Sequence, residues 1–144
     1  RHHVLVLRLY TSSSFSRFNK PLRGVADLAD GAPRRHPFRF SVYVLAEALK
    51  MLRVVGAEMD PEGFNQVRWL FRGMADMEVD IAGRFLAEGG TELALMSTTD
   101  KREVALSYAA SRRPLVFKYK TLGLTRGCSI QFLSLYPKED EYLY

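Results

Sequence analysis

The sequence is poor in the residues that hold disulfide-bonded or metal-bound domains together: it has one cysteine and three histidines in 144 residues. A single cysteine excludes an internal disulfide framework and a zinc site built from several cysteines. The histidines, His2, His3 and His36, lie in the first quarter of the chain, so we expect no metal site. Cys128 falls in a predicted strand and is interpreted as a small buried hydrophobic residue rather than as a reactive thiol.

Long hydrophobic runs are also absent. No stretch approaches the ~20 apolar residues that span a bilayer, so we expect no membrane partner. The apolar run 4–7 is short and lacks a cleavage-site pattern, so no signal peptide is predicted. The chain starts at Arg1 and stops inside the apolar run 142–144, and we expect both ends to belong to a longer chain. The single cysteine is compatible with the cytoplasm, but the sequence specifies no compartment.

Positive charge exceeds negative charge only modestly, with 21 Lys and Arg against 16 Asp and Glu, a net charge of +5. This balance favours anionic partners in general. The densest basic cluster is 34–36, and aromatic residues are not interleaved with the basic ones as they are in a base-stacking surface. We therefore expect no nucleic-acid partner, and a basic module for anionic partners remains the non-enzymatic alternative.

The remaining composition, 47% apolar and 26% charged residues, is typical of a globular domain with a sizeable core. We expect one domain over 1–144, with a mainly helical part over 1–63 and a strand-rich core over 64–144. The clearest helix is predicted over 38–55, where apolar residues recur at helical spacing between Pro37 and Gly56.

The second half of the chain has strand patterns and a single clear helix. Asp100 is expected to cap that helix, over 101–110, with Glu103 capping back. Strands are predicted over 67–72, 92–97, 115–121, 129–135 and 142–144. Helices that precede a mostly antiparallel sheet indicate an α+β fold.

Polar residues that could take part in binding or catalysis lie at the ends of three of these strands, in order along the chain. Arg72 and Gly73 end the first, and Ser97-Thr98-Thr99 ends the next. The acidic triplet Glu139-Asp140-Glu141 follows the strand before the C-terminus. If the chain is extended through the triplet, its two glutamates project to one face and share one small site, because side chains alternate along a strand.

In this order and at about this spacing, the three motifs resemble the arginine-serine-glutamate class of mono-ADP-ribosyltransferases, which includes arginine-modifying bacterial toxins and animal ecto-enzymes. In that class one strand carries the arginine, often followed by glycine. A Ser/Thr-x-Ser/Thr motif lies at the next element, and a Glu/Gln-x-Glu motif follows a later strand. The resemblance covers about residues 66–144. It implies an ADP-ribosyltransferase-like split mixed β-sheet core with a helical N-terminal part.

The resemblance also implies a reaction, in which the bond between nicotinamide and ribose of NAD is broken and ADP-ribose passes to a nucleophile, without a metal. Glu141 would stabilise the positive charge that develops at the ribose carbon. Arg72 would hold the NAD phosphates, and Gly73 would let the nicotinamide amide approach the backbone. Ser97 would orient Glu141, and Thr98 would be a further NAD contact.

Glu139 would decide the acceptor. By the resemblance, a residue of this kind two positions before the catalytic glutamate goes with arginine as substrate, and a carboxylate can hold a guanidinium and help remove its proton. The implied partners are therefore NAD and an acceptor protein that carries an arginine. Two alternatives stay open: an NAD glycohydrolase with water as acceptor, and a catalytically inactive domain that binds NAD or a partner.

For three further side chains the sequence allows two interpretations each. Tyr108 and Phe85 could stack on nicotinamide, but core packing is the preferred interpretation for both. Arg126 could be a second phosphate contact, although a turn arginine that faces water is preferred.

Overall fold

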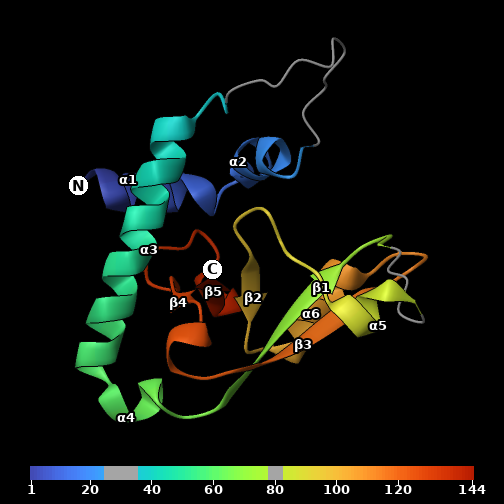
Figure 1. The fold of residues 1–144 in the computed structure, drawn as a ribbon. Coiled ribbons are helices and arrows are strands. Elements are labelled where there is room, and N and C mark those ends of the chain that lie inside the picture. The colour runs from blue at the N-terminus through green and yellow to red at the C-terminus, as the bar shows by residue number, and fades with distance from the viewer. Residues whose placement is uncertain (25–35, 78–82) are drawn as a thin grey trace.

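The computed structural model describes residues 1–24, 36–77 and 83–144, with helices gathered at the N-terminal end and strands after them (Figure 1). The helices of the first half are α1 (His2–Tyr10), α2 (Phe15–Leu22), α3 (Arg39–Met59) and α4 (Pro61–Phe64). The later elements are β1 (Arg68–Met74), α5 (Arg84–Glu88), β2 (Ser97–Thr99), α6 (Arg102–Ala109), β3 (Leu115–Thr121), β4 (Cys128–Ser129) and β5 (Glu141–Leu143). The α+β arrangement matches the sequence prediction. Arg34 and Arg35, which belong to the predicted basic cluster 34–36, lie outside the described residues.

The strands form one five-stranded sheet in the order β3-β1-β2-β5-β4. Each of its four pairings is antiparallel, and β1 pairs with β3 along the full length of both strands. In contrast, β1 meets β2 at the single pair Phe71 and Thr99. The long β1–β3 ribbon and the short strands β2, β5 and β4 are therefore joined at one narrow point, where the candidate site lies.

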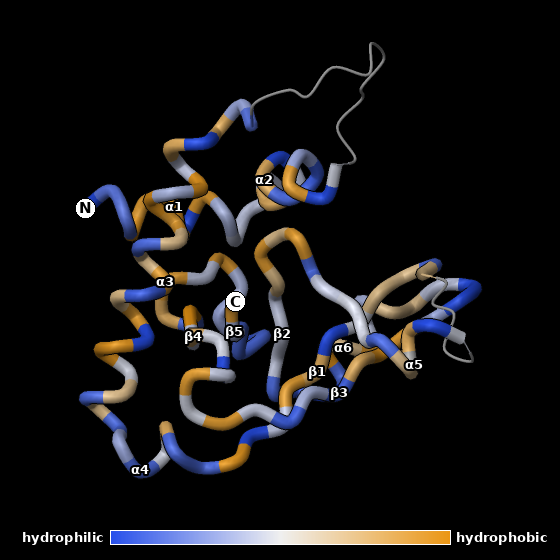
Figure 2. The backbone as a smooth tube through the Cα atoms, in the orientation of Figure 1, coloured by the Kyte–Doolittle hydropathy of each residue, from blue (hydrophilic) through white to orange (hydrophobic). Residues whose placement is uncertain are grey.

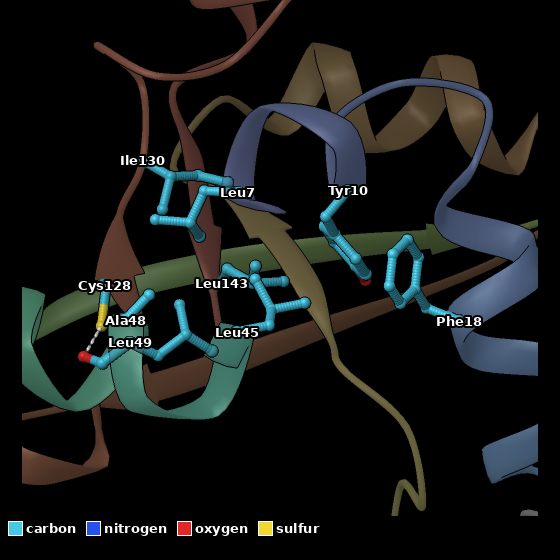
Figure 3. Packing of buried hydrophobic residues seen from close by; sticks show 9 residues of the cluster. All are labelled: Leu7, Tyr10, Phe18, Leu45, Ala48, Leu49, Cys128, Ile130 and Leu143. Atoms are coloured by element: carbon cyan, nitrogen blue, oxygen red, sulfur yellow. Dashed lines mark hydrogen bonds between the residues drawn. The ribbon is translucent and has the colours of Figure 1, made fainter. Parts of the chain in front are cut away.

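The main hydrophobic core lies between the N-terminal helices and the short strands. Figure 3 shows its buried members, Leu7, Tyr10, Phe18, Leu45, Ala48, Leu49, Cys128, Ile130 and Leu143. As interpreted, Cys128 is a small buried residue; its thiol donates a hydrogen bond to the carbonyl of Leu49 at 2.9 Å, and burial raises the pKa of that thiol. Because the core takes side chains from both parts of the chain, the helical part fixes the position of the short strands.

Helix α3 has the amphipathic pattern that the sequence predicted, with polar and apolar residues alternating along it (Figure 2). It continues past Gly56 to Met59, because Gly56 does not adopt the positive φ that ends a helix. Asp60 then begins α4, where its carboxylate accepts a hydrogen bond from the amide of Gly63 at 2.9 Å. Within the described residues, no helix has the length and apolar character to cross a membrane.

Three further local predictions were wrong, and tertiary contacts explain each. Strand β2 begins at Ser97 rather than at 92, because the preceding segment is held by side-chain contacts. The strand predicted over 129–135 ends at Ser129, where the chain turns so that the amide of Ser134 donates to the carbonyl of Ile130 at 2.8 Å. Asp100 does not cap α6 with its side chain but forms an ion pair of 3.5 Å with Arg68.

Candidate active site

A cavity of about 410 Å³ lies where β1, β2, β5, α6 and the N-terminal helices meet. All six residues that the sequence singled out line it: Arg72, Gly73, Ser97, Thr98, Glu139 and Glu141. The helical part supplies the opposite wall, through Tyr10–Ser13, Phe15, Asn19 and Arg23. The structure therefore brings together motifs that are up to 69 residues apart in the sequence, and adds a wall that the sequence motifs did not indicate.

Arg72 extends from β1 into this cavity, with its side chain only 15% exposed. Its guanidinium donates to the Glu92 carboxylate at 3.1 Å and to the carbonyl of Ser97 at 3.4 Å. Burial lowers the pKa of Arg72, while the charge of Glu92 acts in the opposite direction. Since the ordinary pKa of arginine is so high, the group keeps its positive charge and provides a fixed cation inside the cavity.

Glu92 lies between two arginines, and sequence reasoning missed both it and Arg23. Arg23 binds both carboxylate oxygens of Glu92 at 2.9 Å, in a bidentate geometry. The amide of Ala94 also donates to Glu92, at 3.0 Å. Burial acts to raise the pKa of Glu92, but Arg23, Ala94 and Arg72 together hold it below its usual value. No local pattern indicated this group, because its members lie just after α2, in a loop and on β1.

The segment that carries Glu92 is also tied to the helical part. The carbonyl of Leu95 accepts hydrogen bonds from the hydroxyl of Tyr10 at 3.3 Å and from the side-chain amide of Asn19 at 3.1 Å. These contacts from α1 and α2 fix the chain just before Ser97. The helical part therefore positions two walls of the cavity, its own and the approach to β2.

Glu141 begins β5 and pairs across the sheet with Thr99 of β2. Burial raises the pKa of the Glu141 carboxyl; a hydrogen bond from Ser97 lowers it, the charge of Glu139 raises it, and Ser134 lowers it through a contact of 3.5 Å. Glu141 is therefore a partly buried carboxylate with the side chains of two serines beside it. Ser134 was not among the predicted site residues, because the chain reverses direction at this serine and the sequence pattern indicated a strand.

Glu139 lines the same cavity, but the backbone around it does not have the extended conformation that was considered from the sequence. The triplet is not extended: residues 137–139 form a turn of 3₁₀ helix, and Asp140 has a left-handed φ of 46°. This tight turn returns the chain, so that Glu139 and Glu141 both face the cavity. The carboxylate of Glu139 accepts hydrogen bonds from the hydroxyl of Tyr108, at 3.1 and 3.0 Å to its two oxygens.

Gly73 and Thr98, which line the cavity, also make contacts that hold the fold together. A Cβ atom at Gly73 would lie 1.7 Å from the carbonyl oxygen of Ala105, so α6 packs directly on the β1 backbone at this point. The hydroxyl of Thr98 donates to the carbonyl of Tyr142 at 3.1 Å, which links β2 to β5. The hydroxyl of Thr98 therefore helps to hold the sheet together, while the residue also lines the cavity.

Arg126 faces neither a ligand site nor water, so both sequence interpretations of it were wrong. The residue is 7% exposed. Its guanidinium donates to the carbonyl of Gly63 at 2.8 Å and to the carbonyl of Gln66, and so holds the connection between α4 and β1. Phe85 is only partly buried; it packs against Phe117, with ring centroids 5.8 Å apart, and it also lines a second cavity. Tyr108 does not pack in the core, since it is 56% exposed.

A second, more open cavity of about 690 Å³ shares Arg23 and Arg72 with the first and includes Glu92. Its other walls are mainly apolar and aromatic: Met74, Met77, Phe85, Leu93, Met96, Phe117 and Tyr119. The two arginines thus stand between two cavities. In the part of the chain that the structure describes, no group of three or more His, Cys, Asp or Glu side chains is placed to hold a metal.

The fold was compared with those of known proteins. No family model matches the chain, and no curated protein matches it significantly. Among solved structures, the eukaryotic mono-ADP-ribosyltransferase ART2.2 is similar with a TM-score of 0.65 and 20% identity, over 99% of this chain and 55% of that one. Exoenzyme S from Pseudomonas aeruginosa, solved with human 14-3-3 protein beta and carba-NAD, gives 0.64 and 19%, over 99% and 60%.

A third similar structure is Plx2a, an ADP-ribosyltransferase toxin from Paenibacillus larvae, with a TM-score of 0.65 and 18% identity over 98% of this chain and 70% of that one. The chain therefore spans 55% to 70% of the length of these proteins. The protein has the ADP-ribosyltransferase fold, as the sequence motifs predicted.

Proposed function

We propose that this domain transfers ADP-ribose from NAD to arginine side chains of acceptor proteins and releases nicotinamide. One observation carries the proposal: Arg72, Glu139 and Glu141 line a single cavity in an ADP-ribosyltransferase fold. A fixed cation, a partly buried carboxylate and a second carboxylate are the groups that this reaction requires.

The two neighbouring cavities suit the shape and charge of NAD. A dinucleotide has two ring systems joined by a pyrophosphate, and here two cavities flank a pair of arginines. Guanidinium groups bind phosphate oxygens in a bidentate way and keep their charge when buried. The nicotinamide half would lie in the cavity that holds Glu141, and the adenine half among the aromatic and methionine side chains of the second cavity.

Glu141 would act on the bond that breaks. As the bond between the ribose carbon and nicotinamide lengthens, its electron pair goes to the nicotinamide nitrogen and positive charge develops on the ribose. A carboxylate fixed beside that carbon stabilises the charge without having to reorganise. Nicotinamide leaves as a neutral molecule, so no general acid is needed. Ser97 and Ser134 would keep the Glu141 carboxylate in one orientation.

Glu139 would act on the acceptor. Its carboxylate can pair with a guanidinium and take the proton that the attacking nitrogen loses as the new bond to ribose forms. Its place on the tight turn just before β5 puts it on the wall of the same cavity as Glu141. Acceptor choice thus depends on a residue separate from the one that drives NAD cleavage.

The direct test is to incubate the 144-residue chain with NAD and agmatine, a small guanidinium compound, and to follow the products by mass spectrometry. We expect ADP-ribosyl-agmatine and free nicotinamide. Nicotinamide release at a rate that agmatine does not change, with no labelled agmatine, would favour the NAD glycohydrolase. No consumption of NAD under any of these conditions would favour the inactive binding domain.

Replacing Glu139 by Gln should separate transfer from hydrolysis. We expect Glu139→Gln to lower transfer to agmatine by about 10²- to 10⁴-fold, because it removes the general base, and to leave most of the NAD hydrolysis intact. Glu58→Gln, on the exposed end of α3, is the matched control and should behave like the parent. An equal fall of both rates in Glu139→Gln would contradict an acceptor-side role.

Replacing Arg72 by Lys should weaken NAD binding more than it slows the chemistry. Lysine keeps the charge but loses the planar fork that binds two oxygens at once. We expect the KM for NAD to rise about 10- to 100-fold, as for the loss of a charge-assisted hydrogen bond. Arg84→Lys, on the exposed helix α5, serves as control. An unchanged KM for NAD in steady-state kinetics would remove Arg72 from the phosphate site.

A further inference from the structure

The acidic turn has little internal structure to hold it in place. Its only regular element is the 3₁₀ turn at 137–139, followed by the left-handed Asp140. Such short turns have few hydrogen bonds of their own. The two residues before the turn, Leu135 and Tyr136, are largely exposed. The orientation of the Glu139 carboxylate must therefore depend on contacts from elsewhere in the chain.

Those contacts come from the end of β2, from the segment that joins it to α6, and from Gln131, whose side-chain amide donates to the carbonyl of Pro137 at 3.1 Å and to the carboxylate of Asp140. The Thr99 hydroxyl donates to the carbonyl of Glu139 at 2.5 Å. Lys101 donates to the carbonyl of Lys138 at 2.7 Å and forms an ion pair of 2.6 Å with Asp140. Together these bonds fix the backbone of the acidic turn on both sides of Glu139.

Tyr108 fixes the side chain itself. Its hydroxyl lies 3.1 and 3.0 Å from the two oxygens of the Glu139 carboxylate, so one phenol proton is shared between them. Partial burial and the Glu139 hydrogen bond raise the pKa of Tyr108 to about 12, so the phenol stays protonated and remains a donor at neutral pH. Helix α6, which carries this tyrosine, packs directly on the backbone of Gly73 through Ala105 and Ala109, so the backbone of Tyr108 is fixed relative to β1.

From this geometry we infer that Tyr108 is a positioning residue for Glu139, and that it sets how much of the cleaved ADP-ribose goes to a guanidinium acceptor rather than to water. The inference rests on the proposed function. Tyr108 hydrogen-bonds the acceptor-side carboxylate, and within the described residues its hydroxyl makes no hydrogen bond to Glu141 or Arg72. Its loss should therefore affect transfer while sparing the cleavage of NAD.

The test measures agmatine labelling and NAD hydrolysis in parallel for the parent and for Tyr108→Phe. We expect kcat/KM for agmatine to fall about 10- to 100-fold, the effect of losing a hydrogen bond to a charged group, while hydrolysis stays at the parent rate. Tyr43→Phe, on the exposed face of α3, is the matched control. In the Glu139→Gln background, Tyr108→Phe should cause no further loss, because the two residues act as one unit.

Thr99→Val is a second variant that keeps the inference testable if Tyr108→Phe fails to fold. It has nearly the same shape but lacks the hydroxyl that holds the Glu139 carbonyl, and the same selective loss of transfer is expected. Transfer at the parent rate in Tyr108→Phe, or an equal fall of transfer and hydrolysis, would overturn the inference. A parent chain that does not label agmatine would instead refute the proposed function.

Discussion

Glu141→Gln should abolish NAD cleavage while making the fold more stable at neutral pH. The variant keeps the size of the side chain but removes the negative charge that would stabilise the ribose cation. We expect both transfer and hydrolysis to fall by about 10²- to 10³-fold or more, as for the removal of a preorganised electrostatic contact. Nicotinamide release, measured for the parent and the variant, checks this directly. Equal NAD breakdown by the two proteins would defeat the assignment of the site.

The stability effect follows from the pKa of Glu141, which burial raises above the usual 4.5. A group whose pKa is higher in the folded than in the unfolded state contributes stability below the unfolded pKa and loses that contribution as pH rises through the folded pKa. At neutral pH the ionised Glu141 therefore costs stability, and the neutral glutamine removes this cost. Thermal unfolding should show the variant above the parent at neutral pH, with the gap closing below pH 4.5.

Under the proposed function, the same raised pKa would set the acid limit of activity in the parent. Only an ionised Glu141 would stabilise the ribose cation, so NAD cleavage should fall at a pH above that expected for an ordinary glutamate. Glu58→Gln, as the control, should leave both the pH profile and the unfolding midpoint close to those of the parent. A variant at Glu141 that is inactive and also less stable at neutral pH would contradict the buried-carboxylate account.

Gly73→Ala should destabilise the protein strongly, although it adds one methyl group. The new Cβ would lie 1.7 Å from the carbonyl oxygen of Ala105 and 2.9 Å from the amide nitrogen of Ala109. Both are backbone atoms of α6, so no side-chain rotation relieves the clash, and the helix must move away from β1. We expect a loss of about 3 kcal/mol, at the upper end for overpacking, which corresponds to a fall in Tm of roughly 10 °C.

Gly56→Ala is the matched control, because a Cβ at Gly56 meets no atom within 4 Å. Gly56 lies inside α3, so alanine there should stabilise the fold by about 1 kcal/mol. Differential scanning calorimetry of the two variants separates the cost of the steric clash at position 73 from the gain in stability that alanine gives over glycine inside a helix. A Gly73→Ala protein that melts with the parent would mean that α6 can move without cost. It would also mean that packing at Gly73 does not fix the backbone of Tyr108.

Gly73 has a packing role that the sequence interpretation did not include. The sequence interpretation gave it a role in letting nicotinamide approach the backbone. In the fold, the space beside Gly73 is taken by Ala105, so close helix packing alone requires a glycine there. Position 73 lines the cavity as well, and the packing requirement is independent of any ligand.

Local patterns predicted the regular elements of the second half well. The strand predicted over 115–121 is β3, and the one predicted over 67–72 is most of β1. Residues 115–121 alternate in polarity and residues 67–72 are rich in β-branched and aromatic residues, and the two strands pair with each other along their full length. The failures, 92–97 and 129–135, are segments whose residues are apolar enough for a strand but whose backbone is held by distant groups. Short strands are stabilised mainly by such contacts, so periodicity cannot locate them.

The amino-acid sequence by itself determined which residue types are available, where the long helices and strands form, and the order in which an arginine, a serine and two glutamates follow them. Only the tertiary structure decided that Glu92 lies between Arg23 and Arg72, and that the Tyr108 phenol holds Glu139. The physical reason is that these residues are far apart along the sequence. Periodicity is a property of neighbouring residues, whereas these pairs are 69, 20 and 31 residues apart and meet only when helices close over the sheet.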